Sequence, residues 1–346
     1  MSDPSLAPLT TIGLGGPAAT LVTAADASEI AEAVRLADAT GRPLLVLAGG
    51  SNVVIADEGF AGTVVLVRSS GLAAARRGDE IELTVQAGQD WDALVAETVA
   101  EGWSGLECLS GIPGSTGATP IQNVGAYGAE VAETLLDVTA YDRVADEIVQ
   151  LPAAECGFGY RHSTFKETDR YVVLSVRFRL TPSLDSRPLR YGELTRVLGV
   201  PAGGVAPLGD VREAVLGLRR SKGMVLDADD PDTRSVGSFF TNPVLDQDTF
   251  AELEARLPEA PPRWDGADGR VKTSAAWLIE RAGFRRGYGR DGVAISSKHT
   301  LALTNRGDGT TAALLSLAEE IVAGVRDAFG VTLVPEPRLV GVTVSV

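Results

Sequence analysis

Five segments of the chain carry apolar residues at the spacing of an amphipathic helix. In the first of them, Ile30 and Val34 share one face, and Asp26 with Glu29 fits a capping box. Gly41 follows this segment and suits its C-terminal cap. The predicted helices span residues 26–40, 90–102, 211–222, 274–281 and 311–329.

Shorter apolar runs between these segments predict β-strands. The run from Val172 to Leu180 alternates with other residues, which is typical of a half-buried strand. The predicted strands are residues 44–47, 53–55, 63–67, 81–85 and 172–180. Because these strands are short and often adjacent, they favour an α+β fold over a doubly wound parallel sheet.

The character of the sequence changes after Leu180, where TPSLDSRPL has the composition of a connection. We therefore expect one mixed domain in residues 1–182 and a second in residues 183–346. The acidic stretch DADDPDTR, residues 227–234, has the composition of an exposed linker.

Composition narrows the functional classes. The 346 residues suit two or three globular domains, and the net charge of −15 argues against nonspecific binding of nucleic acid. No apolar run is long enough to cross a bilayer, and the first residues lack the features of a signal peptide. The two cysteines, Cys108 and Cys156, have no metal-binding spacing, so we expect no metal site and a reducing cytoplasm.

Two glycine-rich segments stand out in the first half: Ala48–Asn52 and Gly111–Gly128, the latter reading GIPGSTGATPIQNVGAYG. The longer one holds five glycines and no charged residue. Glycine turns can direct several main-chain N–H groups at an anion, which suits a diphosphate. Gln122 and Asn123 offer amides that can read the edge of a ring. The alternative to a ligand site is a structural crossing, where two backbones pack closely. Because two such segments occur in one domain, we favour a site for a dinucleotide ligand.

Five motifs, in this order, resemble the UDP-N-acetylenolpyruvoylglucosamine reductase (MurB) family: LAGGSNVVI, SGIPGSTGATPIQNVGAYGAE, CGFGYRHSTFK, GSFFTNP and VPEPRLVG. The resemblance extends from about Thr11 to Val340. The long glycine segment and GSFF-x-NP together are highly specific, whereas LAGGSN alone is weak. Tyr191 in RYGEL, with the insertion around it, looks like the longer, type I-like form of the family.

The resemblance implies a fold. Residues 1–182 would form an FAD-binding PCMH-type domain, as in vanillyl-alcohol-oxidase-like proteins, with two lobes of about 1–70 and 71–182. Residues 183–346 would form the MurB C-terminal α+β substrate domain.

It also implies a cytoplasmic, monomeric enzyme of peptidoglycan precursor synthesis. NADPH would reduce FAD, and the flavin would pass a hydride to the enolpyruvyl group of a UDP-sugar, giving UDP-N-acetylmuramate. The residues that would lie along FAD are Gly49, Gly50, Ser51, Asn52, Gly114, Ser115, Thr116, Thr119, Ile121, Gln122, Asn123, Gly125, Ala126 and Tyr127.

Three motif residues would perform the chemistry. Hydride addition to the enol ether places negative charge beside the substrate carboxylate, and this enolate-like species needs stabilisation and then a proton. Ser238 in GSFF would be the proton donor. Arg161 in GYRH would pair with the carboxylate, since a guanidinium is always charged and can bind it through two nitrogens. Glu336, between two prolines, would either act as an acid or orient the other two.

Further motif residues would bind the substrate. Lys222 follows a basic helix end and aligns with a family lysine, and Asn242 ends the GSFF-x-N motif. Tyr191 is a partner for uracil, and Tyr160 would face the sugar, as would Tyr127. His299 stands where relatives often have glutamine; the alternative is an exposed histidine on a strand.

The sequence departs from the family pattern at Ala48, Thr116 and the pair Thr10-Thr11, which concerns local FAD contacts rather than the reaction. Two other functions stay open. An FAD-dependent alcohol or sugar oxidase would need no NADPH. The sequence shows no obvious histidine for covalent attachment of the flavin, because His162 and His299 both lie outside the glycine-rich segments. A non-catalytic flavin or UDP-sugar binding protein would not need Ser238, Arg161 and Glu336, yet all three are present.

Overall fold

The structure is a computed structural model that describes residues 4–266 and 268–345. The chain forms two compact units. The sheet unit comprises Ala18–Gly49 and Ala61–Ser221. The terminal unit comprises the described residues of Met1–Pro17, Gly50–Phe60 and Lys222–Val346.

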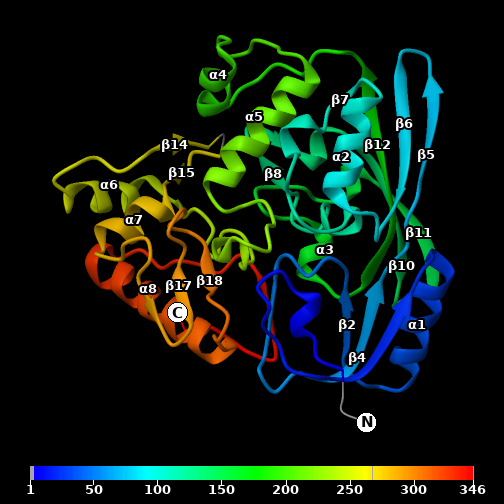
Figure 1. The fold of residues 1–346 in the computed structure, drawn as a ribbon, viewed down its shortest axis with the longest axis horizontal. Helices are drawn as coiled ribbons and strands as arrows, with labels where there is room; N and C mark the ends of the chain where they lie inside the picture. Colours follow the sequence, from blue (N-terminus) through cyan, green and yellow to red (C-terminus); the bar gives the residue numbers. More distant parts are fainter. Residues whose placement is uncertain (1–3, 267, 346) are drawn as a thin grey trace. The chain divides into compact units, whose positions relative to one another are not determined.

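The sheet unit contains two main sheets (Figure 1). The larger has the order β11-β10-β12-β6-β5, with β7 pairing the end of β12, and all its pairs are antiparallel. The smaller has the order β1-β4-β2, in which β2 and β4 run parallel. The strands of the whole sheet unit are β1 (Ala18–Ala24), β2 (Leu44–Leu47), β4 (Phe60–Val67), β5 (Leu72–Arg77), β6 (Glu80–Gln86), β7 (Trp103–Ser104), β8 (Gly125–Ala126), β9 (Ala129–Glu130), β10 (Leu135–Asp142), β11 (Glu147–Pro152) and β12 (Tyr171–Pro182).

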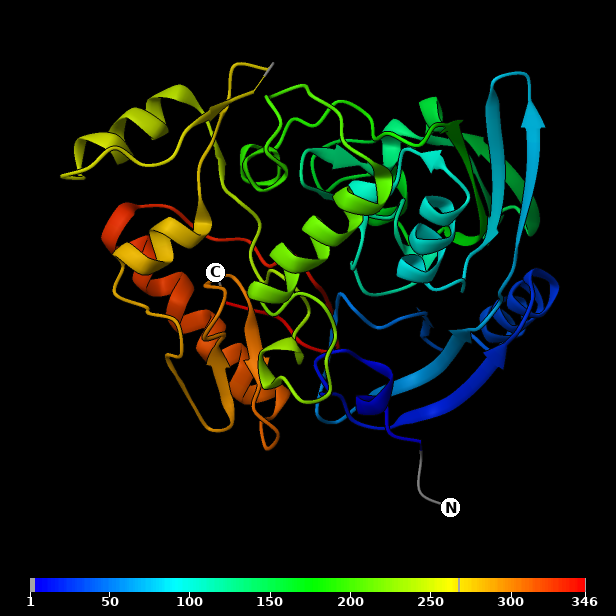
Figure 2. The same cartoon turned by 45° about the horizontal axis from the view of Figure 1, so that its top comes forward.

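The helices of this unit are α1 (Ala27–Ala39), α2 (Trp91–Ala100), α3 (Thr164–Glu167), α4 (Gly192–Leu198) and α5 (Leu208–Ser221). The predicted start of α1 is confirmed, because Asp26 Oδ1 accepts from the N–H of Glu29 at 2.9 Å. The Glu29 carboxylate reaches back to the N–H of Ala25 at 2.7 Å, one residue before the cap. Helix α1 lies along the three-stranded sheet (Figure 2).

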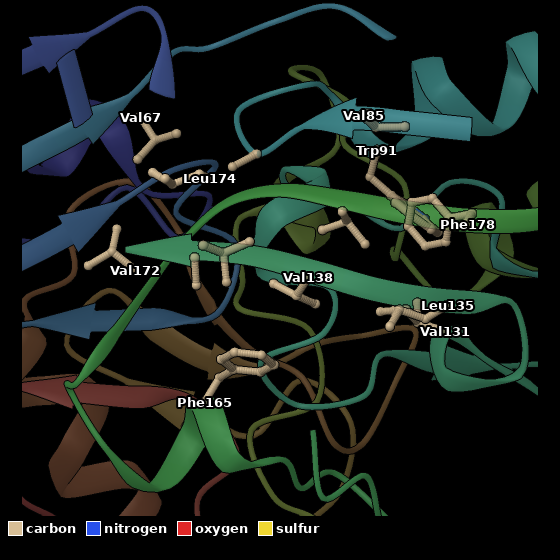
Figure 3. Packing of buried hydrophobic residues seen from close by; sticks show 14 of the residues in the cluster. Val67, Val85, Trp91, Val131, Leu135, Val138, Phe165, Val172, Leu174 and Phe178 are labelled. Carbon is tan, nitrogen blue, oxygen red and sulfur yellow. The ribbon is translucent and has the colours of Figure 1, made fainter. Parts of the chain in front are cut away.

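The core of the sheet unit follows from the register of its central strands. Val176 on β12 lies between Val138 on β10 and Val85 on β6, and all three are fully buried. Figure 3 shows Trp91 packing against Phe178, with ring centroids 6.0 Å apart. The buried Trp91 indole satisfies its N–H by donating to a main-chain carbonyl 3.0 Å away. Strand β10, at the centre of this sheet, was not predicted from the sequence.

The terminal unit is built around α8, which packs on β17 and β18 (Figure 1). Its helices are α6 (Gln247–Ala255), α7 (Ala275–Arg281) and α8 (Thr311–Phe329). Its strands are β3 (Val53–Ile55), β13 (Val244–Leu245), β14 (Trp264–Asp265), β15 (Val271–Lys272), β16 (Gly289–Arg290), β17 (Val293–Ile295), β18 (Leu303–Asn305) and β19 (Arg338–Val340). Strands β3 and β19 pair in parallel, so they join two segments that are distant in sequence.

The compact units differ from the predicted division at residues 182 and 183. Residues 183–221 pack within the sheet unit, because Val211 and Val215 of α5 and Leu194 of α4 are buried in one cluster with Cys108. The two main sheets of this unit fall on either side of residue 70. The division into a cofactor domain and a substrate domain stays a prediction.

No helix in the described part of the chain is both long and apolar enough to cross a membrane.

An ion pair between the buried Asp142 and the exposed Arg170 gives this fold a testable pH dependence. Asp142 at the end of β10 accepts two hydrogen bonds of 2.9 and 2.5 Å from Arg170 into the same oxygen. The hydrogen bond from Arg170, supported by the N–H groups of Ala145 and Val144, lowers the pKa of Asp142 from 3.8 to about 2. A lowered pKa in the folded state means that this stabilisation is complete above pH 3.8 and is lost as the pH falls through about 2.

We therefore expect Asp142→Asn to lower the free energy of unfolding at pH 5 and to reduce its decline towards pH 2. Urea unfolding of the wild type and the variant across this range measures the difference. Asp79→Asn, at an exposed turn, is the matched control. An equal pH dependence in the wild type and Asp142→Asn would contradict the assignment.

Candidate active site

The two glycine-rich segments meet within the sheet unit. A Cβ atom added to Gly49 would lie 2.5 Å from the Cα of Gly114 and 3.2 Å from the nitrogen of Ser115. Contacts this short admit only glycine at position 49. The alternative reading of the glycines as a crossing of two backbones is confirmed, and this crossing brings together the two segments predicted to hold a diphosphate.

The main-chain N–H groups of the long segment divide into two sets. Those of Thr116 and Gly117 donate to carbonyls of residues 89 and 87 at 2.8 Å, and those of Ala118 and Thr119 donate within the segment. Among the described residues, no partner accepts from the N–H groups of Gly49, Gly114 or Ser115. These three lie at the crossing and are the donors that can receive an anion.

Two threonine hydroxyl groups of the long glycine-rich segment donate to main-chain carbonyls of the protein. Thr116 Oγ1 donates to the carbonyl of Gln89 at 3.1 Å, and Thr119 Oγ1 donates to the carbonyl of Thr116 at 2.8 Å. Both residues are buried. Their hydroxyl protons thus stabilise the loop, and contact of these two residues with FAD stays a prediction.

The amide of Asn123 is also committed to the protein. Its Oδ1 accepts from the N–H of Ala132 at 3.1 Å, and its Nδ2 donates to Glu130 at 2.7 Å and to the carbonyl of Gly159 at 3.1 Å. The side chain of Asn123 is therefore occupied by the protein, and the reading of a ring edge by either predicted amide stays a prediction.

Arg161 lies on a tight turn that is attached to the glycine-rich segment. Gly159 and His162 exchange two main-chain hydrogen bonds of 3.1 and 3.2 Å, so Tyr160 and Arg161 form the tip. Arg161 Nη2 donates to the carbonyl of Gly125 at 2.9 Å, and its guanidinium stacks over the ring of Tyr160. The structure thus brings the predicted carboxylate-binding cation onto the segment predicted to line the flavin.

Apolar surface remains exposed around this turn. Ile121, Tyr160 and Tyr191 are large hydrophobic residues with 37% to 40% of their surface exposed. The rings of Tyr127 and Tyr191 meet edge to face with centroids 5.3 Å apart. Exposed apolar and aromatic side chains of this kind can contact an aromatic ligand.

In the terminal unit, the predicted proton donor and the predicted carboxylate lie on adjacent backbones. The N–H of Glu336 donates to the carbonyl of Phe239 at 2.8 Å, and Phe240 forms an isolated antiparallel β-bridge with Pro335. On the other side, the N–H of Phe239 donates to the carbonyl of Leu301 at 2.7 Å. Ser238, one residue before Phe239, is therefore held between the segment of Glu336 and the loop that follows β17.

The second half of the short glycine-rich segment is hydrogen-bonded to the segments that carry Ser238 and Glu336 or lie next to them. Thr11 donates its N–H to the carbonyl of Gly50 at 3.0 Å and its hydroxyl to the carbonyl of Ser235 at 2.6 Å. The N–H of Arg338 donates to the carbonyl of Asn52 at 3.0 Å. Gly50 is required here for packing, because an added Cβ would lie 2.0 Å from the carbonyl oxygen of Leu9. Ser51 lies between these anchored residues.

The predicted substrate residues of the terminal unit have different settings. Asn242 Oδ1 accepts from the N–H of Ala275 at 3.0 Å and so supports the start of α7. Lys222 follows the end of α5 and is half-buried. His299 lies in the loop between β17 and β18, half-buried, with its N–H on the hydroxyl of Ser296 at 3.2 Å. The alternative of an exposed histidine on a strand is wrong.

The stretch expected to be an exposed acidic linker contains a buried anchor for this loop. Asp232 is 4% exposed and accepts from both the N–H and the hydroxyl of Ser297. Arg306 adds a third hydrogen bond at 3.0 Å. Burial raises the pKa of Asp232, but the bonds from Ser297 and the charge of Arg306 outweigh it, and the net pKa is lowered. The carboxylate stays ionised and fixes the loop of His299.

Sequence reasoning missed a charged network behind the long glycine segment. Asp92 on α2 accepts two hydrogen bonds from Arg212 of α5, at 2.6 and 2.9 Å, and one from the N–H of Gly111. Arg219 lies about two turns further along α5 than Arg212, on the same face. Burial lowers the pKa of Arg219, and the charges of Tyr127 and Asp92 act in the opposite direction. No sequence signal could reveal this network, because 120 positions separate Asp92 from Arg212.

Comparisons with known proteins identify the class. Residues 18–149 match an FAD binding domain family, and residues 229–340 match the family described as UDP-N-acetylenolpyruvoylglucosamine reductase, C-terminal domain. The chain is thus a flavin-dependent oxidoreductase that combines an FAD-binding domain of PCMH type with a MurB C-terminal domain, which confirms the predicted fold class.

The particular family follows from whole-chain similarity. The UDP-N-acetylenolpyruvoylglucosamine reductase of Thermobifida fusca is 60% identical over 345 residues, covering 98% of this chain and 97% of that protein. The enzyme of Salinispora arenicola is 59% identical, covering 96% and 93%. This chain belongs to the UDP-N-acetylenolpyruvoylglucosamine reductase family. The crystal structure of the Thermus caldophilus reductase (MurB) has a TM-score of 0.65 at 24% identity, covers 97% of each chain, and supports the fold.

Within the part of the chain that the structure describes, no group of three His, Cys, Asp or Glu side chains is arranged to hold a metal ion.

Proposed function

We propose that this chain uses NADPH and bound FAD to reduce UDP-N-acetyl-3-O-(1-carboxyvinyl)glucosamine to UDP-N-acetylmuramate. It would do so in the cytoplasm, as a monomer, as a step of peptidoglycan precursor synthesis that serves cell wall growth, cell shape and division. The relatives that carry the name of this reductase, at up to 60% identity over nearly the whole chain, motivate the proposal. The observation that carries it is the hydrogen bond from Glu336 to Phe239, which places Ser238 and Glu336 on adjacent backbones.

The residues present fit FAD. The N–H groups of Gly49, Gly114 and Ser115 have no acceptor among the described residues and meet at one crossing, which suits one phosphate of a dinucleotide. Ile121, further along the same segment, is an exposed apolar residue that suits the face of a flavin ring. A protein with a net charge of −15 needs such local donors to hold an anion.

Bound FAD would supply the hydride carrier between NADPH and the enolpyruvyl group. Ser238 would then donate the proton of its hydroxyl to the carbon next to the substrate carboxylate, where negative charge develops. A serine hydroxyl is a weak acid, so it needs a strongly basic acceptor, and an enolate-like carbon is one. Glu336 would have one of two roles: it supplies a proton if it is itself protonated, or it orients its neighbours if it is ionised.

Arg161 would hold the substrate carboxylate and the charge that develops beside it. Its guanidinium donates to the carbonyl of Gly125, and its planar fork can bind a carboxylate through two nitrogens. The stacking on Tyr160 keeps the guanidinium plane in one orientation. Pre-oriented donors of this kind stabilise a developing anion without reorganising during the reaction.

The remaining predicted residues would bind the UDP-sugar. Lys222 would supply a cation for the diphosphate, and Asn242 an amide next to it. Tyr191, exposed and fixed by Tyr127, would stack on the uracil, and Tyr160 would face the sugar. His299, in the loop anchored by Asp232, would complete the set.

Two half-reactions test the proposal. Purified chain should be yellow or become yellow with FAD, NADPH should bleach the flavin without oxygen, and the enolpyruvyl UDP-sugar should then restore the colour. An oxidase would instead be bleached by an alcohol or sugar and recoloured by oxygen. A binding protein would bleach slowly and would not respond to the UDP-sugar. A chain that cannot take up FAD would refute the proposal.

A further inference from the structure

Three residues of the candidate site have a backbone conformation that is unusual outside glycine. Asn123, Tyr127 and Arg161 have φ angles of 45°, 51° and 52°. Asparagine tolerates this left-handed region better than most residues, whereas tyrosine and arginine tolerate it poorly. Such a conformation persists only where surrounding contacts hold it. For Arg161, at the tip of a two-residue turn, the two main-chain hydrogen bonds between Gly159 and His162 close the turn, and contacts from outside it can add to them.

Asn123 makes the contacts that can do this. The residue is 1% exposed, and its three hydrogen bonds connect it to two other segments, residues 130–132 and the turn that begins at Gly159. It accepts from Ala132, which follows β9, and donates to Glu130 on β9. Its second N–H bond reaches the carbonyl of Gly159, the first residue of the turn that carries Arg161.

The guanidinium of Arg161 lies at Gly125, which pairs with Glu130 of β9. A Cβ atom added to Gly125 would lie 2.9 Å from Cγ of Glu130 and 3.3 Å from Nη1 of Arg161, so both side chains pass the same glycine. Arg161 also donates to the carbonyl of Gly125. Asn123 therefore fixes both the base of the turn and the strand β9 that faces Gly125.

From this geometry we infer that Asn123 is a positioning residue, which sets the orientation of Arg161 by clamping Gly159 to Glu130 and Ala132. The inference deepens the proposed function and rests on it, because Arg161 is taken as the residue that holds the substrate carboxylate. Glycine could adopt the backbone at position 123 without strain, so the amide side chain is the reason for asparagine there.

The variant that isolates the side chain is Asn123→Gly. It keeps the left-handed backbone and removes all three hydrogen bonds. We expect the rate of substrate reduction, measured at saturating FAD, to fall about ten- to hundredfold relative to the wild type, as for the loss of buried hydrogen bonds. Asp291→Gly, at another non-glycine residue with a φ of 52°, is the matched control and should change neither half-reaction.

A double-mutant cycle separates positioning from a general structural role. If Asn123 acts through Arg161, Asn123→Gly should lower the rate by less than about twofold in an Arg161→Ala background, because the two effects are coupled. The same factor in both backgrounds would overturn the inference. Glu130→Ala, which removes one of the three contacts, should give a smaller loss with the same dependence on Arg161, and it serves if Asn123→Gly does not fold.

Amide hydrogen exchange gives a readout that needs no activity. In Asn123→Gly the amide of Ala132 should exchange faster, and so should the amides of residues 159–162. Faster exchange at Ala132 alone would overturn the inference, because the turn of Arg161 would then be independent of Asn123. If the wild type fails to reduce the UDP-sugar, the proposed function fails, but exchange at residues 159–162 still decides whether Asn123 holds the turn.

Discussion

Ser238→Ala should leave the bleaching of bound FAD by NADPH intact and lower the rate of substrate reduction by about 10²- to 10⁴-fold, the usual contribution of a general acid. The reason is that hydride delivery needs no proton from Ser238, whereas completion of the product does. The hydrogen bond from Glu336 to Phe239 and that from Phe239 to Leu301 fix the backbone on both sides of position 238, so the substitution should not disturb the segment. Anaerobic stopped-flow measurement of the two half-reactions checks the result.

Thr241→Ala is the matched control for this prediction. Thr241 lies three residues further along the same segment, and its hydroxyl contacts only a main-chain carbonyl at 3.4 Å among the interactions described. Both half-reactions should survive its removal. If Ser238→Ala keeps both half-reactions at the wild-type rate, Ser238 is not the proton donor.

Gly49→Ala should weaken FAD binding about ten- to hundredfold. The new methyl group would lie 2.5 Å from the Cα of Gly114, which is backbone and cannot swing aside. Forcing such a contact costs about 1–3 kcal/mol, and each 1.4 kcal/mol is a factor of ten in affinity. The two segments would have to separate, which would move the N–H groups of Gly49, Gly114 and Ser115 apart. Fluorescence titration of the apoprotein with FAD measures the change.

Gly217→Ala is the control glycine substitution. Position 217 lies inside α5, and an added Cβ meets nothing within 4 Å. Alanine there should raise the free energy of unfolding by up to about 1 kcal/mol, since glycine is unfavourable within a helix. FAD affinity should not change. Unaltered FAD affinity in Gly49→Ala would show that the crossing of the two glycine segments is not part of the cofactor site.

The sequence predicted the elements whose signals are local. The start of α1 at Asp26, the buried strand Leu44–Leu47 and the end of α8 near Phe329 all follow from caps and periodicity within a few residues. Strand β10 was missed although it is central, because its apolar residues alternate imperfectly and its partners come from β11 and β12. The predicted division at residue 182 shows the same limit, because α5 packs with residues that lie about a hundred positions earlier.

For the candidate site, the motifs fixed which residues to consider, and the resemblance supplied FAD and the UDP-sugar. The roles within the long glycine segment could not be read from the motif. Thr116, Thr119 and Asn123 have the same donors and acceptors as residues that bind ligands, yet in the structure their side chains are committed to carbonyls and amides of the protein.

By itself, then, the sequence determined the helices and strands with strong local periodicity, the family and the set of chemically capable side chains, because these depend on residue types and short spacings. Only the tertiary structure decided which of those groups remain open to a ligand. A hydrogen-bond donor can serve a ligand only if no protein acceptor takes it. For Gly49, Gly114 and Ser115 on one side, and Thr116 and Asn123 on the other, that depends on segments far away in the chain.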